Sequence, residues 1–152
     1  MKPIRLLLEN REVVVVDLGT SIVQAARVMS ERQIGAVPVV DDDRVAGIFT
    51  ERDILSRVVA AGVDPATTPV SSVMTTNLVT AEIGESHDVC MRRMQQARVR
   101  HLLVLCEGRL AGMLSMRDLV GLELDERDEA ITLLNAYVHY IPADLQPTKS
   151  VT

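Results

Sequence analysis

The sequence contains two copies of one pattern, separated by 65 positions along the chain. Residues 13–55 align with residues 78–120 without a gap, and 11 of the 43 aligned pairs are identical, where about three are expected from average composition. Two units of this size are too few for a solenoid, so the repeat predicts one domain built from two similar halves. The identical pairs are Val14/Val79, Gly19/Gly84, Ser21/Ser86, Arg27/Arg92, Met29/Met94, Val39/Val104, Arg44/Arg109, Ala46/Ala111, Gly47/Gly112, Arg52/Arg117 and Asp53/Asp118.

Each copy predicts the element order β-α-β-β-α, so the expected fold class is α/β (α+β) with tandem repeats. Ser21 and Ser86 stand where helix N-caps belong, and apolar residues recur at helical spacing after them. Strands with so few polar positions need cover on both faces, which two halves related by a pseudo-two-fold axis would supply. The expected strands are 13–16, 37–40 and 45–49, then 78–80, 102–105 and 110–114, with second helices beginning at Thr50 and Ser115.

The segments outside the aligned copies complete the predicted organisation. Residues 1–60 hold the first repeat with a lead-in helix, 61–73 a linker, 74–122 the second repeat, and 123–152 a tail. The tail is expected to form an amphipathic helix over 125–140, stopped by Pro142, whose apolar side docks on its own domain. That apolar stripe consists of Ile131, Leu133, Leu134, Tyr137 and Val138.

Charge and composition exclude several classes of protein. The net charge is −5 without a basic block, and aromatic residues make up only 2%, so nucleic-acid binding is not expected. No apolar run approaches a membrane span, and charges at Glu9, Arg11 and Glu12 interrupt the N-terminal segment, which argues against a signal peptide. The sequence therefore predicts a cytoplasmic protein without a membrane partner.

The cysteines and histidines show no metal-ligand spacing, so no metal site is predicted. Cys90 and Cys106 are interpreted as small buried side chains rather than a disulfide pair. His87 and His139 have no partners at useful spacing and are expected at the surface.

The segments Gly47–Asp53 and Gly112–Asp118 are the most informative, because each ends a strand with Thr or Ser and places Asp three residues later. This spacing is that of a capping box, which stabilises a helix start without any ligand. The same geometry also suits a nucleotide: helix N-terminal N–H groups attract phosphate, and the carboxylate can accept two hydrogen bonds from a ribose cis-diol. Arg52 or Arg117 would add charge-assisted contacts to phosphate.

Two in-register copies of G-h-h-[ST]-x-x-D, each following an apolar strand and an acidic turn, resemble CBS domains, the family named after cystathionine β-synthase. The resemblance covers about residues 8–122. It implies two clefts between the repeats for an adenosine ligand such as AMP, ADP, ATP, NAD(H) or S-adenosylmethionine, with adenine between aliphatic side chains. It places Thr50, Arg52, Asp53, Asn77, Leu78, Val79, Val99, Arg100 and His101 in one cleft, and Ser115, Arg117, Asp118, Val14, Val15, Ile34, Gly35 and Ala36 in the other.

The two implied clefts differ in charge. Arg100 and His101 align with Gly35 and Ala36, so only the first cleft has two extra cationic candidates for phosphate. The alternatives remain a solvated surface charge for Arg100 and a structural role for His101. Leu103 replaces Pro38 in the second copy, which leaves the backbone contacts there open.

Three functions remain in competition. No P-loop, metal cluster or nucleophile elbow is present in the sequence, so an enzyme is not expected and no catalytic cofactor is predicted. The preferred hypothesis is a ligand-sensing regulatory module that signals to an unknown protein partner, and the alternative is an interaction module with empty clefts. The resemblance also implies a disc-like homodimer, consistent with apolar residues on the second helices: Ile54, Leu55, Val58, Val59, Leu119, Val120 and Leu122.

Overall fold

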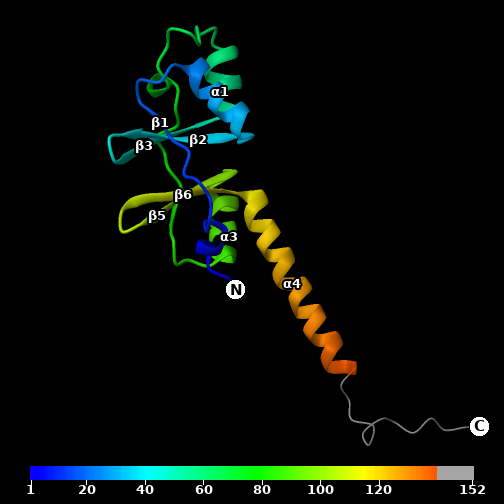
Figure 1. Ribbon diagram of the computed structural model, residues 1–152. Helices are drawn as coiled ribbons and strands as arrows, with labels where there is room; N and C mark the ends of the chain where they lie inside the picture. The colour runs from blue at the N-terminus through cyan, green and yellow to red at the C-terminus, as the bar shows by residue number, and fades with distance from the viewer. Residues whose placement is uncertain (140–152) are drawn as a thin grey trace, which may run out of the picture.

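The computed structural model describes residues 1–139 and shows two stacked three-stranded sheets with helices on their outer sides (Figure 1). The first repeat comprises β1 (Val16–Asp17), α1 (Ile22–Arg32), β2 (Ala36–Asp41), β3 (Arg44–Thr50), the short α2 (Glu51–Asp53) and a π-helix over Ile54–Val59. The second comprises β4 (Thr80–Glu82), α3 (His87–Ala97), β5 (His101–Cys106), β6 (Arg109–Ser115) and α4 (Met116–His139). Short 3-10 turns lie at Ile4–Leu7 and Val70–Ser72. The predicted mixed fold with tandem β-α-β-β-α repeats is confirmed.

The two sheets have the same strand order and the same register. In each, a short first strand pairs in parallel with a central strand that pairs antiparallel with the third. Ala36 opposes Thr50 in β2–β3, and His101 opposes Ser115 at the corresponding place in β5–β6. A register shift follows Val39 in one sheet and Val104 in the other. The 65-residue sequence repeat is therefore also a repeat of backbone pairing.

The helices that follow the first strands also begin and end at matching residues. Ser21 caps α1 by accepting a hydrogen bond from the backbone N–H of Gln24, whereas Ser86 stands at the N-cap of α3 without such a bond. Both helices end on a residue in the left-handed conformation, with φ of 54° at Gln33 and at Arg98. A left-handed residue commonly terminates a helix, so each chain turn into the central strand has the same geometry.

Each repeat has its own core, and a third cluster joins the two. Phe49 lies fully buried in the first core, and Leu114 in the second. Between the sheets, Ala36, Ile48 and Leu103 are buried together, with Met113 packed against them. Since Ile48 and Met113 occupy equivalent positions, this interface follows the pseudo-two-fold relation of the repeats.

Several predicted elements begin elsewhere than expected. The first strands start at Val16 and Thr80 rather than at residues 13 and 78, because the preceding residues form no ladder with the central strands. The lead-in helix is only the 3-10 turn Ile4–Leu7. The second helix of the first repeat changes from α to π geometry at Ile54.

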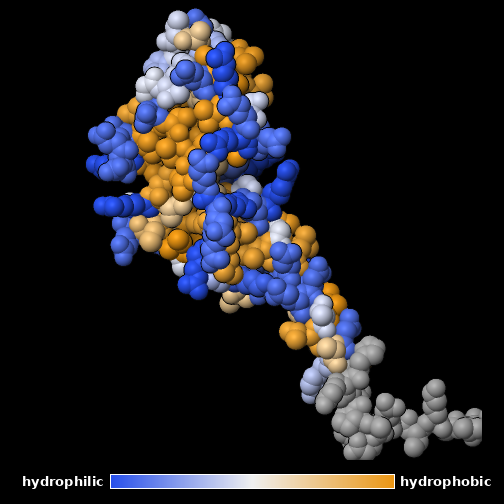
Figure 2. All heavy atoms as spheres, in the orientation of Figure 1, coloured by the Kyte–Doolittle hydropathy of each residue, from blue (hydrophilic) through white to orange (hydrophobic). Residues whose placement is uncertain are grey.

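The tail is helical but does not dock on its own domain. It continues the second helix of repeat two as part of α4, which projects away from both sheets (Figure 1). The apolar stripe is exposed along this projection, as Figure 2 shows, and the exposed fractions of its residues range from 55% at Ile131 to 82% at Tyr137. The docking expectation is wrong because α4 diverges from the sheets. Pro142 lies outside the described residues.

Two expectations for single residues are also wrong. Cys106 is exposed at the end of β5, whereas Cys90 is buried as expected. His87 is fully buried, because the N-terminal segment and α4 cover it. His139 is the last residue of α4. None of the helices in residues 1–139 has the length and apolar character that a membrane crossing requires.

Candidate functional site

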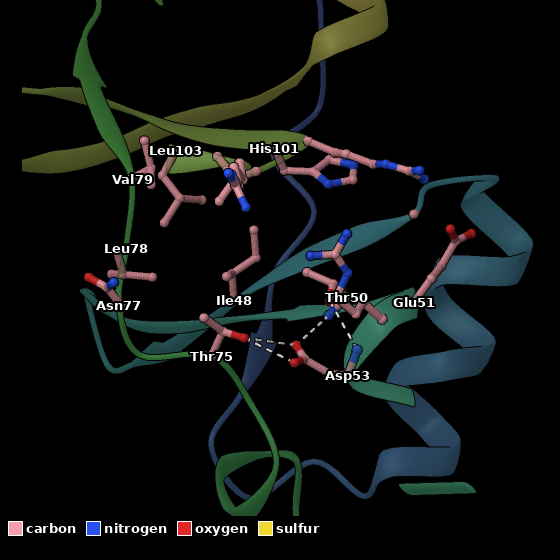
Figure 3. A pocket seen from close by; sticks show the side chains of 15 residues that line it. Ile48, Thr50, Glu51, Asp53, Thr75, Asn77, Leu78, Val79, His101 and Leu103 are labelled. Atoms are coloured by element: carbon pink, nitrogen blue, oxygen red, sulfur yellow. Dashed lines mark hydrogen bonds between the residues drawn. The ribbon is translucent and has the colours of Figure 1, made fainter. Parts of the chain in front are cut away.

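A cavity of about 210 Å³ lies between the two repeats, and we call it cleft 1. Its walls come from the end of β3 and α2 on one side, and from the connection between the repeats and the start of β5 on the other (Figure 3). This connection, called the linker from here on, comprises residues 60–79, because the second sheet begins only at Thr80. The lining residues are Gly35, Ile48, Thr50, Glu51, Arg52, Asp53, Thr75, Asn77, Leu78, Val79, Arg98, Val99, Arg100, His101 and Leu103.

Thr50 and Asp53 form the capping box expected from their spacing. The Thr50 hydroxyl accepts a hydrogen bond from the Asp53 N–H at 3.2 Å, and Asp53 Oδ2 accepts one from the Thr50 N–H at 3.0 Å. These reciprocal bonds satisfy two N–H groups that a helix start would otherwise leave unpaired. Helix capping thus engages Asp53 Oδ2 and leaves Oδ1 for another partner.

Thr75 supplies that partner. Its hydroxyl lies 3.0 Å from Asp53 Oδ1 and 3.2 Å from Oδ2, as Figure 3 shows. Thr75 is held there by two backbone hydrogen bonds to Ile48, which attach the linker to the edge of β3. A Cβ on Gly47 would lie 2.9 Å from the Thr75 carbonyl oxygen, so the linker approaches this closely only beside glycine.

Asp53 is 4% exposed, so its carboxylate is nearly desolvated and depends on these partners. The Arg57 guanidinium is the nearest cation, with Nε 3.7 Å from Asp53 Oδ1. Arg57 also donates to the carbonyl oxygens of Val73 and Met74, at 3.2 and 2.8 Å. The carboxylate, the π-helix and the linker are therefore connected in one network.

Cleft 1 has an aliphatic end and a polar end. Ile48, Leu78, Val79 and Leu103 gather at one end, and Thr50, Asp53, His101 and Glu51 lie toward the other (Figure 3). Three arginines, Arg52, Arg98 and Arg100, also line cleft 1. Three guanidinium groups outnumber the two carboxylates of Glu51 and Asp53, so the lining of cleft 1 has a net positive charge, which suits an anionic group.

His101 lines cleft 1 with its ring in a desolvated position. Burial lowers the pKa of His101 below its usual value, Arg100 lowers it further, and Glu51 and Asp118 oppose the shift. The imidazole is therefore neutral near pH 7. His101 lines cleft 1 together with Arg100, and its lowered pKa favours the neutral imidazole in the free protein.

A second, wider cavity of about 890 Å³, cleft 2, adjoins cleft 1. Gly35, Glu51, Arg100 and His101 line both cavities, so the expectation that only the first cleft has Arg100 and His101 is wrong. Ser115 and Asp118 repeat the capping pair, with the Ser115 N–H donating to Asp118 Oδ2 at 2.8 Å. Burial tends to raise the pKa of Asp118, but hydrogen bonds from Arg11 and Ser115 hold it below the usual value. The Arg11 guanidinium donates to Asp118 Oδ1 at 2.9 Å. Oδ1, the oxygen that takes no part in capping, is therefore engaged in an ion pair.

The CBS domain family model matches residues 8–60 and 70–125 of the chain. The chain belongs to the CBS domain family. It is 32% identical over 124 residues to the CBS domain-containing protein YhcV of Bacillus subtilis, covering 82% of this chain and 88% of that protein. The crystal structure of the CBS-domain protein ATU1752 from Agrobacterium tumefaciens matches with a TM-score of 0.74 at 38% identity, covering 80% of this chain and 99% of that one.

A second similar structure contains a ligand. The CBS domain protein PAE2072 from Pyrobaculum aerophilum, complexed with AMP, matches with a TM-score of 0.70 at 25% identity, covering 77% of this chain and 89% of that one.

The CBS resemblance located cleft 1 more completely than cleft 2. All nine residues predicted for cleft 1 line it. In cleft 2, Ser115, Arg117, Asp118, Ile34 and Gly35 line the cavity, whereas Val14, Val15 and Ala36 do not. Val14 packs on the first core, Val15 precedes β1, and Ala36 is buried between the sheets.

Sequence reasoning missed six residues of cleft 1: Gly35, Ile48, Glu51, Thr75, Arg98 and Leu103. Position in the sequence could have indicated two of these six residues. Leu103 belongs to a strand already assigned to the CBS repeat, and Arg98 directly precedes the predicted Val99. Thr75 had no sequence signal, because its position depends on the pairing of the linker with Ile48.

Replacing Thr75 with valine should destabilise the protein, because the buried Asp53 Oδ1 would lose its hydroxyl donor. We expect Thr75→Val to lower the free energy of unfolding by about 1–3 kcal/mol in urea titrations. Thr76→Val is the matched control, since Thr76 is the exposed neighbouring threonine, and should change stability by less than about 0.5 kcal/mol. Equal stability of the two variants would show that the Thr75–Asp53 bond contributes nothing.

Proposed function

We propose that this CBS-domain chain is a regulatory module that binds an adenosine nucleotide in cleft 1 and passes the signal on by a change in shape. The observation that carries the proposal is the position of Asp53. Its Oδ2 caps the helix, while its Oδ1 meets only a rotatable hydroxyl and a guanidinium at 3.7 Å. A carboxylate oxygen has room for a further donor, so a ribose hydroxyl could share Oδ1 or replace Thr75 there.

The two ends of cleft 1 match the two ends of a nucleotide. The aliphatic side chains of Ile48, Leu78, Val79 and Leu103 would enclose the adenine ring, whose faces need apolar contacts. The ribose would lie against Asp53 and Thr50. Phosphate would reach the arginines, whose guanidinium charges favour an anion, because the N–H groups of Thr50, Glu51 and Asp53 already donate within the protein.

Cleft 1 is proposed as the first site to fill. In cleft 2 the corresponding carboxylate is already paired with Arg11, so a ribose would have to displace an ion pair rather than a hydroxyl. Displacing a charged guanidinium from a carboxylate costs more than displacing a neutral hydroxyl, which favours cleft 1.

AMP is the first candidate ligand, because the similar protein PAE2072 is complexed with AMP. ADP, ATP, NAD(H) and S-adenosylmethionine share the adenosine group and remain candidates. Glu51 lines cleft 1 close to Gly35, so its carboxylate would repel the negative charge of each phosphate added beyond that of AMP.

The proposed role is regulatory and not catalytic, exercised in the cytoplasm toward an unidentified protein. The signal requires an equilibrium between two relative arrangements of the repeats. A ligand in the cleft shifts this equilibrium only if it binds the two arrangements with different affinity, and such coupling is typically about 1–3 kcal/mol. The network from Asp53 through Arg57 to the linker carbonyls of Val73 and Met74 is a physical connection along which occupancy could change the repeat-to-repeat geometry.

A nucleotide panel tests the proposal. AMP, ADP, ATP, NAD(H) and S-adenosylmethionine are added separately at millimolar concentration in thermal unfolding experiments. At 100 times its dissociation constant, a ligand of the native state adds about 2.7 kcal/mol and raises the melting temperature. An unmoved melting curve with every compound would favour the alternative, an interaction module whose clefts stay empty.

Asp53→Asn tests the ribose contact separately from helix capping. The amide oxygen can still accept from the Thr50 N–H, but the amide nitrogen cannot accept from ribose. Calorimetry should show affinity weakened by about 1–3 kcal/mol, whereas the equivalent Asp118→Asn in cleft 2 should bind like the unmodified protein. The proposed assignment fails if Asp53→Asn retains full affinity.

His101 gives nucleotide binding a predicted pH dependence. Burial lowers the pKa of His101 in the free protein, and a phosphate nearby would raise it again. Binding would then take up a proton, so AMP affinity should rise as the pH falls from about 7.5 through 6.5. His101→Gln removes this contribution while leaving the titration of AMP itself. Identical pH profiles for both proteins would show that His101 does not face phosphate.

We also propose a homodimer formed through the second helices. Leu55 and Val59 are each 67% exposed on the π-helix, and Leu124 is 56% exposed on α4, so apolar side chains are available for a second copy to cover. Val58, Leu119 and Leu122, also expected on this surface, are buried within the chain instead. Burial of this surface by a second copy would give a closed two-fold assembly. Light scattering at micromolar concentration should report about twice the chain mass of 16.7 kDa. A monomer with and without nucleotide would contradict the proposal.

A further inference from the structure

We propose that His87, Glu123 and Glu126 form a binding site for one divalent transition-metal ion of the Zn²⁺ class, remote from both clefts. His87 is the first residue of α3, and the two glutamates lie three residues apart on α4. One ligand atom from each side chain lies within 4.8 Å of the other two. The sequence spacing did not indicate this group, because 36 positions separate His87 from Glu123.

The donor atoms already have separations suited to a small cation. His87 Nε2 lies 2.7 Å from Glu123 Oε2 and 3.4 Å from Glu126 Oε2. Zinc bonds of about 2.0–2.1 Å in tetrahedral geometry place ligand atoms about 3.3 Å apart. A cation therefore requires a small outward shift of Glu123, whose side chain is 29% exposed, together with its partner Arg127, whose side chain is 71% exposed.

Each of the three proposed metal-binding side chains also makes a contact through the polar atom that would not bind the metal. Glu123 Oε1 accepts from the Arg127 guanidinium at 2.9 and 3.0 Å, and Glu126 Oε1 pairs with the N-terminal amine of Met1. The His87 Nδ1 atom lies 3.1 Å from the Lys2 carbonyl oxygen. The Lys2 backbone N–H lies 3.2 Å from the same Nδ1 atom and donates to it when Nε2 carries the proton. Metal binding would use the other tautomer, in which Nδ1–H donates to the Lys2 carbonyl oxygen and the Nε2 lone pair faces the metal. Outer contacts of this kind orient ligands in metal sites.

Charge supports a cation at this place. Residues 123–129 carry five carboxylates and one arginine, so this stretch of α4 is strongly negative. Without a metal, an Nε2–H group directs its proton chiefly to the nearer carboxylate, whereas a divalent cation would satisfy both. One imidazole with two carboxylates favours Zn²⁺, Mn²⁺, Fe²⁺ or Co²⁺ over Ca²⁺ and Mg²⁺, which prefer all-oxygen ligands.

Bound metal would join the start of α3 to α4 just before α4 projects from the domain (Figure 1). The ion would replace the hydrogen bond between His87 and Glu123 with one bond to His87 on α3 and two bonds to the glutamates on α4. These bonds would fix the direction in which α4 leaves the domain. The side chains of Glu123 and Glu126 are 29% and 31% exposed, which leaves room for water at the remaining coordination positions.

The test uses the full chain without an affinity tag, freed of metal with a chelator, and Zn²⁺ alone as the titrant. Calorimetry should show one Zn²⁺ per chain, with a matching rise in melting temperature. Glu123→Gln and Glu126→Gln should each weaken binding at least tenfold, and His87→Ala should abolish it. Co²⁺ in place of Zn²⁺ should give visible absorption bands that disappear in the same variants.

Glu129→Gln, His101→Gln and His139→Asn are the controls, because Glu129 belongs to the same acidic stretch and the two histidines are the others in the chain. All three should bind Zn²⁺ like the unmodified protein. Since His87→Ala could fail to fold, the two glutamine variants decide the outcome. The proposal is overturned if both retain full affinity, if a control loses it, or if the unmodified protein binds no Zn²⁺.

Discussion

The apolar contact between the two sheets is the constraint on which the rest of the structure depends. Ala36, Ile48 and Leu103 are buried there, and Met113 packs on them from the second repeat. Each three-stranded sheet has helices on one face only, so the other face needs a partner, and the second repeat provides it. Two adjoining cavities lie beside this contact. Cleft 1 receives the helix start that follows β3 together with residues of β5, and cleft 2 receives the start of α4 together with residues of α1 and of the turn that follows it. The nucleotide proposal concerns these two cavities.

Each aspartate at these helix starts has two separable tasks. Oδ2 of Asp53 and of Asp118 accepts the backbone bond of the capping box, so the helix start is stable without a ligand. Oδ1 meets Thr75 in cleft 1 and Arg11 in cleft 2. Capping and ligand binding were alternatives at the level of sequence. In the structure, capping engages Oδ2 of each aspartate, and the proposed ribose contact would use Oδ1 of Asp53. The two clefts differ because the partner of Oδ1 is a neutral hydroxyl in cleft 1 and a charged guanidinium in cleft 2.

The parts of the fold that the sequence predicted are those set by local pattern and by the repeat. The strand pairing and the helix ends follow the 65-residue offset, as the left-handed residues Gln33 and Arg98 show. The Arg11–Asp118 pair joins residues 107 positions apart, and His87 meets Lys2 across 85, so no local signal could reveal either contact. The exposure of the α4 stripe escaped prediction for the same reason. An amphipathic pattern shows that a helix has an apolar face, but not which surface covers it.

An isoleucine-methyl NMR titration with AMP tests the central claim most directly, because isoleucines lie at the places that matter. Ile48 lines cleft 1, Ile34 and Ile54 line cleft 2, and Ile131 is exposed on the projecting part of α4. The account predicts a saturable shift of the Ile48 methyl signal at lower AMP concentration than any shift of Ile34 or Ile54, with Ile131 unchanged. A titration that leaves the Ile48 signal in place, or that moves only Ile131, would contradict it.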